Sequence, residues 1–239
     1  MQAERYQMLN VKDHGELRVR TERSAELGDS VMHCMIFPSE FRNVQATYPI
    51  LWQKNPETGG FFALALFGFE EGENLFLNED GWAEAYVPLM IRRQPLLIGF
   101  QGKGEEDRQA VVSIDSESPR LNRSEGEELF LAHGGVSDYL ARMSDLLEAV
   151  HHGHLQSDQF CALLEKHQLL EPFVLDVTLD SGEQCQLIGF YAINEERLQN
   201  LSADALHELQ EKGALAPVFM AVASQSQFRP LIARKNRNR

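Results

Sequence analysis

Short apolar stretches separated by turn residues dominate the first half of the chain. Residues 48–53 have the sequence Tyr-Pro-Ile-Leu-Trp-Gln, and residues 61–69 are almost wholly apolar. Between them, residues 55–60 contain the proline and glycines that favour a chain reversal. A third apolar run, residues 31–37, comes earlier and is followed by a proline. We therefore predict three strands here, the last two of them joined as a β-hairpin.

A similar arrangement recurs twice further along the chain. A proline opens each unit, and a polar turn then separates two apolar segments. The opening prolines are Pro49, Pro95 and Pro172, and the turns span residues 55–60, 102–107 and 180–183. Three hairpins are therefore predicted. Whether they descend from a duplication is left open, because so short a recurrence also arises by coincidence.

The first and third units share one further detail. Leu66-Phe-Gly-Phe69 matches Leu187-Ile-Gly-Phe190. If the units are equivalent, both segments should form inner strands, with Gly68 and Gly189 at crowded positions where another backbone approaches closely. A larger side chain at either glycine would then cost stability through overpacking.

Helical spacing of apolar residues is typical of the second half. Ser137 can cap a helix that ends near Gly153, and a second helix is predicted from Ser157 to just before Pro172. A third is capped by Ser202 and ended by Gly213. A last helix is predicted over residues 217–233, with Pro230 bending it or ending it early.

These elements predict an α+β fold, with antiparallel hairpins packed against helices and a helix-rich C-terminal half. The chain of 239 residues, 43% of them hydrophobic, has enough material for one large domain or two smaller ones. If there are two, the first is a strand-rich lobe over residues 1–150. The second is a helix–hairpin–helix lobe over residues 151–239 that ends in a basic tail.

The net charge of the chain and its distribution limit the classes of partner that are expected. The formal net charge is −14, although every residue after Glu211 is neutral or basic. The body is therefore strongly acidic and repels nucleic acid, so a nucleic-acid partner is not expected. The basic side chains of the last eleven residues are Arg229, Arg234, Lys235, Arg237 and Arg239. We expect them to form a frayed, solvated end.

The sequence also bears on location. Its longest apolar stretches are far shorter than the roughly 20 residues of a membrane-spanning helix, so no membrane span is expected. The first residues lack the features of a secretory signal. Three widely spaced cysteines, Cys34, Cys161 and Cys185, suit a reducing compartment better than a disulfide framework. A cytoplasmic location is predicted.

One segment carries residue types that ligate metals. His151, His152 and His154 lie close to Asp158 and Cys161, and zinc accepts imidazole, carboxylate and thiolate ligands. The alternative is a solvated helix end, where histidines suit the negative end of the helix dipole. This interpretation is favoured, because Gly153 should break the helix between the ligands.

The strongest candidate for binding is a set of aromatic and basic residues: Trp82, Tyr86, Arg92 and Arg93. Aromatic faces beside guanidinium groups suit the recognition of a carboxylate, a sugar or another protein. In the alternative, Trp82 and Tyr86 belong to the core and the arginines pair with some of the many acidic residues.

Residues 71–95, which include these side chains, resemble the central signature of the SapC family. Nearly the whole chain shares the resemblance, and Leu96 departs from it where an aromatic residue is expected. The matching features are Asn74-Leu75-Phe76, Trp82, Tyr86-Val87-Pro88 and Arg92-Arg93. The resemblance implies a bacterial family fold without assigned catalytic or metal residues. It also implies a link to surface-layer export or outer-membrane uptake. The peptide-transporter permease of the same name is excluded by the expected lack of a membrane span.

Two hypotheses about function follow. The first is an accessory protein, not an enzyme, which binds a protein partner through Trp82, Tyr86, Arg92 and Arg93 and needs no cofactor or metal. The second is a metal-dependent enzyme that uses the segment His151–Cys161. No residue is assigned a catalytic role, and the oligomeric state is left open.

Overall fold

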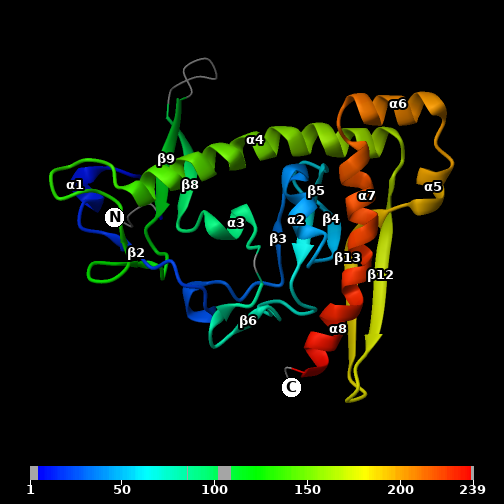
Figure 1. Cartoon of the computed structure of the whole chain (residues 1–239), viewed down its shortest axis with the longest axis horizontal. Helices are drawn as coiled ribbons and strands as arrows, with labels where there is room; N and C mark the ends of the chain where they lie inside the picture. The colour runs from blue at the N-terminus through cyan, green and yellow to red at the C-terminus, as the bar shows by residue number, and fades with distance from the viewer. Residues whose placement is uncertain (1–4, 85, 102–108, 238–239) are drawn as a thin grey trace. The chain divides into compact units, whose positions relative to one another are not determined.

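Figure 1 shows the computed structural model, which describes residues 5–84, 86–101 and 109–237. Antiparallel sheets combine with several helices, and the C-terminal half is rich in helix, so the predicted α+β class is confirmed. The chain divides into two compact units. Unit 1 comprises residues 1–29 and 89–152, and unit 2 comprises residues 30–88 and 153–239. No helix within the described residues is both long and apolar enough to cross a membrane.

Each unit is thus assembled from two stretches that are distant in sequence. The boundary between His152 and Gly153 falls close to the predicted one at residues 150 and 151. However, residues 30–88 group with the C-terminal part of the chain rather than with the other N-terminal residues. The division into lobes of residues 1–150 and 151–239 stays a prediction.

Unit 1 is built from two small sheets with helices. The strand orders are β1-β9-β8 and β10-β2-β11, and all the pairs are antiparallel. Its elements are β1 (Tyr6–Met8), α1 (Val11–His14), β2 (Arg18–Val19), η1 (Ala25–Leu27), α3 (Leu89–Arg92), β8 (Leu96–Gln101), β9 (Gln109–Asp115), β10 (Leu121–Asn122), β11 (Glu127–Glu128) and the first part of α4 (Asp138–Lys166).

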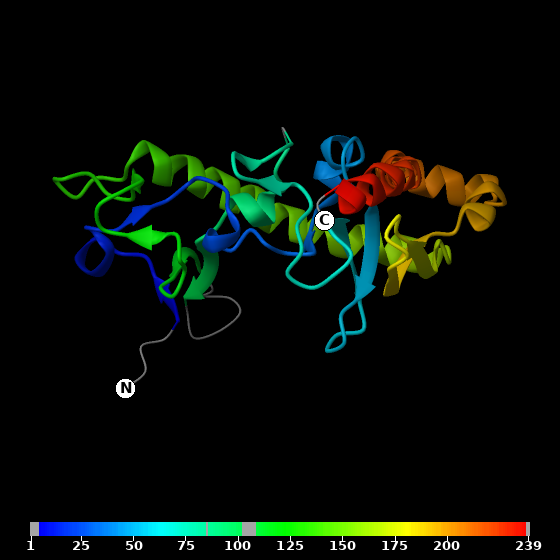
Figure 2. The same ribbon diagram turned by 90° about the horizontal axis from the view of Figure 1, so that it is seen from below.

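Unit 2 contains a five-stranded antiparallel sheet in the order β12-β13-β4-β5-β3. Helix α7 lies over one face of it and contacts β13 and β4 (Figure 2). The elements are β3 (His33–Met35), η2 (Pro38–Glu40), α2 (Phe41–Val44), β4 (Ile50–Lys54), β5 (Phe61–Leu66), β6 (Leu77–Asn78), β7 (Gly81–Trp82), β12 (Leu170–Thr178), β13 (Gln184–Ile193), α5 (Glu195–Gln199), α6 (Ala203–Glu211), α7 (Leu215–Ser224), η3 (Gln225–Gln227) and α8 (Phe228–Arg237).

The three predicted hairpins are confirmed as the antiparallel pairs β4–β5, β8–β9 and β12–β13. The first and third belong to the same sheet, where Tyr191 of β13 pairs with Trp52 of β4. The second lies in unit 1, and its predicted turn at residues 102–107 lies outside the described residues.

The predicted equivalence of Gly68 and Gly189 is wrong. Gly68 follows β5 in a crowded place, because a Cβ there would lie 2.7 Å from the carbonyl oxygen of Glu73. Gly189 lies within β13 and is exposed, with no heavy atom within 4 Å of a Cβ placed there. Its φ of +84° accompanies a register shift between Phe173 and Leu175 of β12. Gly189 therefore serves the backbone geometry of a bulge, not close packing.

The predicted helix break at Gly153 is also wrong, since α4 runs without interruption from Asp138 to Lys166. A Cβ on Gly153 would lie 2.4 Å from Cγ of Phe37. Glycine is thus needed at this position for the close approach of an aromatic ring, and the roughly 1 kcal/mol that it costs a helix relative to alanine is offset by packing. Gly153 is thus a packing position inside the helix and does not end it.

The helix caps are confirmed, and the last helix differs from its prediction. Ser137 and Ser202 accept hydrogen bonds from the first turns of their helices, at 3.1 and 3.2 Å. Gly213 after α6 has the left-handed φ of +68°. The C-terminal segment forms α7, a short 3₁₀ turn and α8. Pro230 is tolerated because it lies in the first turn of α8, where backbone N–H groups have no partner within the helix.

Candidate functional site

The aromatic residues of the signature are joined by hydrogen bonds inside unit 2. The indole nitrogen of Trp82 donates to the hydroxyl of Tyr48 over 2.8 Å, and that hydroxyl donates to the backbone carbonyl of Tyr86 over 2.7 Å. Tyr48 is fully buried, and burial raises its pKa well above the usual value. The Trp82 ring also meets Phe67 edge to face at 5.2 Å.

Tyr86 continues this chain of hydrogen bonds to a buried carboxylate. Its hydroxyl donates to Glu40 at 2.8 Å, and the other carboxylate oxygen of Glu40 accepts from the backbone N–H of Phe37 at 3.0 Å. Only 3% of Glu40 is exposed. The polar ends of Trp82 and Tyr86 are thus used to hold unit 2 together.

The two predicted arginines belong to unit 1. Arg92 ends α3 and is exposed, whereas Arg93 is half-buried and donates to the carbonyl oxygen of Leu96 at 2.9 Å. The four predicted binding residues are therefore divided between the units: Trp82 and Tyr86 in unit 2, Arg92 and Arg93 in unit 1. Their role in binding stays a prediction.

Arg93 lines a pocket of about 360 Å³ within unit 1. Other lining residues include Arg5, Tyr6, Pro95 and the two acids Asp115 and Glu117. Arg5 donates two hydrogen bonds to Asp115, of 2.9 and 2.7 Å. This contact is the main reason that the pKa of the Asp115 carboxyl is lowered. Among the described residues, no carboxylate lies within ion-pair distance of Arg93. Burial lowers the pKa of Arg93, but guanidinium groups remain charged in proteins.

A buried charge network supports two walls of this pocket. Asp29 is fully buried and binds Arg120 at 2.6 Å and Arg23 at 3.2 Å, and only 1% of the Arg120 side chain is exposed. The second guanidinium nitrogen of Arg120 donates to the carbonyl oxygens of two residues near β2. The pocket residues Gly28 and Pro119 directly precede Asp29 and Arg120 in the chain. The Asp29–Arg120 ion pair therefore holds the backbone beside each of these two pocket residues.

The histidines near the middle of α4 pack against aromatic rings. The ring centroid of His151 lies 6.1 Å from that of Phe100 in unit 1, and that of His154 lies 5.0 Å from that of Phe37 in unit 2. Cys161 is buried, and burial raises its pKa to about 12. Among the described residues, the three-residue group with converging metal-ligand atoms lies elsewhere and contains none of these side chains.

Two of the C-terminal basic residues, Arg234 and Lys235, are docked in unit 2, so the prediction of a frayed, solvated end is wrong for them, whereas Arg229 and Arg237 are exposed. Lys235 of α8 is 3% exposed and its ammonium lies 2.7 Å from a carboxylate oxygen of Glu70 and 2.5 Å from one of Glu73. Arg234 pairs with Glu84 and lies over the ring of Phe76, 4.5 Å from its centroid. Arg239 lies outside the described residues.

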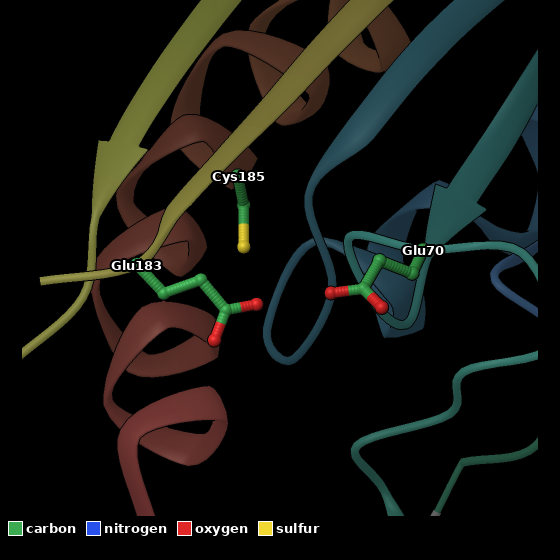
Figure 3. Close-up of side chains that lie close together, drawn as sticks. All are labelled: Glu70, Glu183 and Cys185. Carbon is green, nitrogen blue, oxygen red and sulfur yellow. The ribbon is translucent and has the colours of Figure 1, made fainter. Parts of the chain in front are cut away.

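Beside Lys235, three side chains from two distant parts of the sequence converge. Glu70 lies in the loop after β5, Glu183 precedes β13, and Cys185 is the second residue of β13. Each offers a ligand atom, and these atoms all lie within 4.8 Å of one another. Figure 3 shows the Cys185 sulfur and the Glu183 and Glu70 carboxylates directed toward a common space. Cys185 is 7% exposed, and Figure 3 shows its side chain extending from the strand toward the two carboxylates.

The sequence model of the SapC family matches residues 9–231. This chain belongs to the SapC family. Comparisons with curated proteins and with solved structures gave no match. The match covers most of both units, but Arg5 and Tyr6 of the Arg93 pocket and Lys235 of α8 lie outside it. The family match assigns no role to any of these residues.

Proposed function

We propose that this SapC-family protein is a cytoplasmic, non-catalytic accessory protein that binds a protein partner through Arg92 and the Arg93 pocket. The observation that carries this proposal is the state of Arg93. Its half-buried guanidinium lines a pocket and has a backbone carbonyl as partner, while the neighbouring Asp115 is held by Arg5. Such a group has donors left for a ligand.

A carboxylate is the ligand that this pocket suits best. Guanidinium groups present planar pairs of N–H donors that match the two oxygens of a carboxylate. The ring of Tyr6 and the ring of Pro95 line the same pocket and offer apolar contact to the rest of a side chain. Arg92 is exposed at the end of α3, directly before Arg93 in the chain. It adds a positive charge that attracts an acidic segment. An acidic side chain or a chain terminus of a protein partner meets these requirements.

The family supports the choice of partner class. The SapC name connects its members with surface-layer export, and we propose that the partner belongs to such a system or to an outer-membrane uptake system. Trp82 and Tyr86 stay part of the proposed set of binding residues. Since their polar atoms are engaged within unit 2, the arginines provide the charge-dependent part of recognition.

The test compares Arg93→Ala with a control, Arg123→Ala, another arginine of unit 1 whose side chain is 73% exposed and pairs with an exposed Glu16. Each purified protein is used to capture partners from a lysate of the source organism, and captured proteins are identified by mass spectrometry. We expect Arg93→Ala to lose a partner that both wild type and Arg123→Ala retain, and a peptide carrying that partner's acidic segment to compete for binding.

Melting temperatures separate binding from folding. Arg93→Ala should melt within a few degrees of the wild type, because the expected loss is that of an external contact. Retention of every captured protein by Arg93→Ala, or a loss accompanied by unfolding that the milder Arg93→Lys also shows, would overturn the proposal. Arg93→Lys keeps the charge but not the planar fork, so it should bind the partner more weakly while folding normally.

A further inference from the structure

The cluster beside Lys235 in unit 2 carries an inference that is independent of the Arg93 pocket. Three ligand atoms, two carboxylate oxygens and one sulfur, lie within 4.8 Å of one another. The sequence did not predict a metal site from these residues. Acidic side chains near one another are common and do not by themselves make a site. The decisive side chain is therefore the thiol of Cys185.

Cys185 is more than nine-tenths buried and points toward the space between the carboxylates of Glu70 and Glu183 (Figure 3). Among the described residues, no hydrogen-bond partner is found for its sulfur. A buried cysteine in a purely structural role normally lies among apolar side chains. This one is directed at two carboxylates, which is an arrangement typical of ligands around a cation.

The carboxylates beside Lys235 can also serve a cation. Glu70 and Glu73 each place one oxygen within hydrogen-bond distance of the Lys235 ammonium. Lys235 does not prevent metal binding, because a carboxylate has two oxygens and can bind an ammonium through one while ligating a metal through the other.

We propose that Glu70, Glu183 and Cys185 form a binding site for a transition-metal ion of the Zn²⁺ type. The donor set selects among metals, since thiolate sulfur excludes Mg²⁺ and Ca²⁺ as preferred ions, and Zn²⁺ accepts both sulfur and carboxylate oxygen. Three protein ligands leave one tetrahedral position for water. Lys235 donates to Glu70 and holds its carboxylate in place.

Metal binding at this site must release a proton, because the ligand form of cysteine is the thiolate. As the sulfur–metal bond forms, the S–H proton leaves to solvent.

The test uses Co²⁺ as a spectroscopic probe and Zn²⁺ as a competitor with the full-length, tag-free protein. We expect about one equivalent of Co²⁺ to produce the thiolate-to-metal absorption of a sulfur-ligated site, and Zn²⁺ to displace it. Cys185→Ser should abolish that absorption. Glu183→Gln, a change at an exposed position, should weaken binding by about tenfold or more.

Asp180→Asn is the matched control, because Asp180 is an exposed acid in the same hairpin turn and lies outside the converging group. It should bind Co²⁺ as the wild type does. Equal loss in Asp180→Asn and Glu183→Gln would show a diffuse acidic surface and overturn the site. Binding without the sulfur absorption, or absorption that survives in Cys185→Ser, would place the metal elsewhere and overturn it as well. If Cys185→Ser does not fold, the pair of turn variants decides alone.

Discussion

The two units contain charge clusters that are unbalanced in opposite directions. In unit 1, the carboxylate of Asp29 meets two guanidinium groups, and both Asp29 and Arg120 are closed off from solvent. In unit 2, the ammonium of Lys235 meets two carboxylates, with Glu73 20% and Glu70 54% exposed at the side chain. Burial makes the first cluster a structural element, because its charges have no alternative partner in water. The partial exposure of the second leaves it able to accept an ion from solution.

The largest effect is expected on removal of the shared carboxylate in unit 1. Asp29→Ala leaves Arg120 buried without a counter-charge, so we expect a loss of about 3–5 kcal/mol in the free energy of unfolding. Urea denaturation measures this loss. The control is Glu16→Ala, whose side chain is 82% exposed and which should change stability by no more than about 0.5 kcal/mol. Similar values for the two variants would show that the buried network contributes little.

A smaller loss is expected at the corresponding position in unit 2. Lys235→Met keeps the buried stem of the side chain but removes the ammonium, and the carboxylates that it leaves can be rehydrated. We therefore expect about 1–3 kcal/mol, again by urea denaturation. Arg237→Met, at an exposed position of the same helix, is the control and should be nearly neutral. A loss larger than that of Asp29→Ala would reverse the comparison between the clusters.

The smallest effect concerns the surface pair at the Arg93 pocket. Because Arg5 lowers the pKa of Asp115 in the folded protein, this pair contributes stability above the unfolded pKa of about 3.9, and loses it as the pH falls through the folded value. Arg5→Ala should therefore destabilise the protein only slightly at pH 7, and by less still in strong acid. Urea denaturation at both pH values checks this. A difference that grows toward acid would contradict the assigned pairing.

Local patterns in the sequence were enough to predict the hairpins, two serine caps and the left-handed Gly213, because each depends on residues that are neighbours in the chain. Gly153 and Gly189 were misread for the opposite reason. The role of the first depends on a ring more than a hundred positions away, and that of the second on the register of the opposite strand. No spacing rule could connect either glycine with its partner.

The charged residues show the same limit. Arg93 was selected because it lies in a recognisable motif, although its pocket could not be foreseen. Lys235 seemed to be part of a solvated tail. Glu70 carried no signal either, because the order of strands in the sheet brings it close to Glu183 and Cys185 across more than a hundred residues. The charge excess after Glu211 was the one available hint, since a basic end opposite an acidic body favours docking.

The order of strands in the sheet of unit 2 has a consequence for synthesis on the ribosome. Strands β3, β4 and β5 emerge early, but β13, the neighbour of β4, is made only after the whole of α4. Until then β4 has an open edge whose hydrogen-bonding groups can pair with another nascent chain. During translation the protein is thus expected to depend on chaperones for longer than its length suggests, until the late hairpin covers that edge.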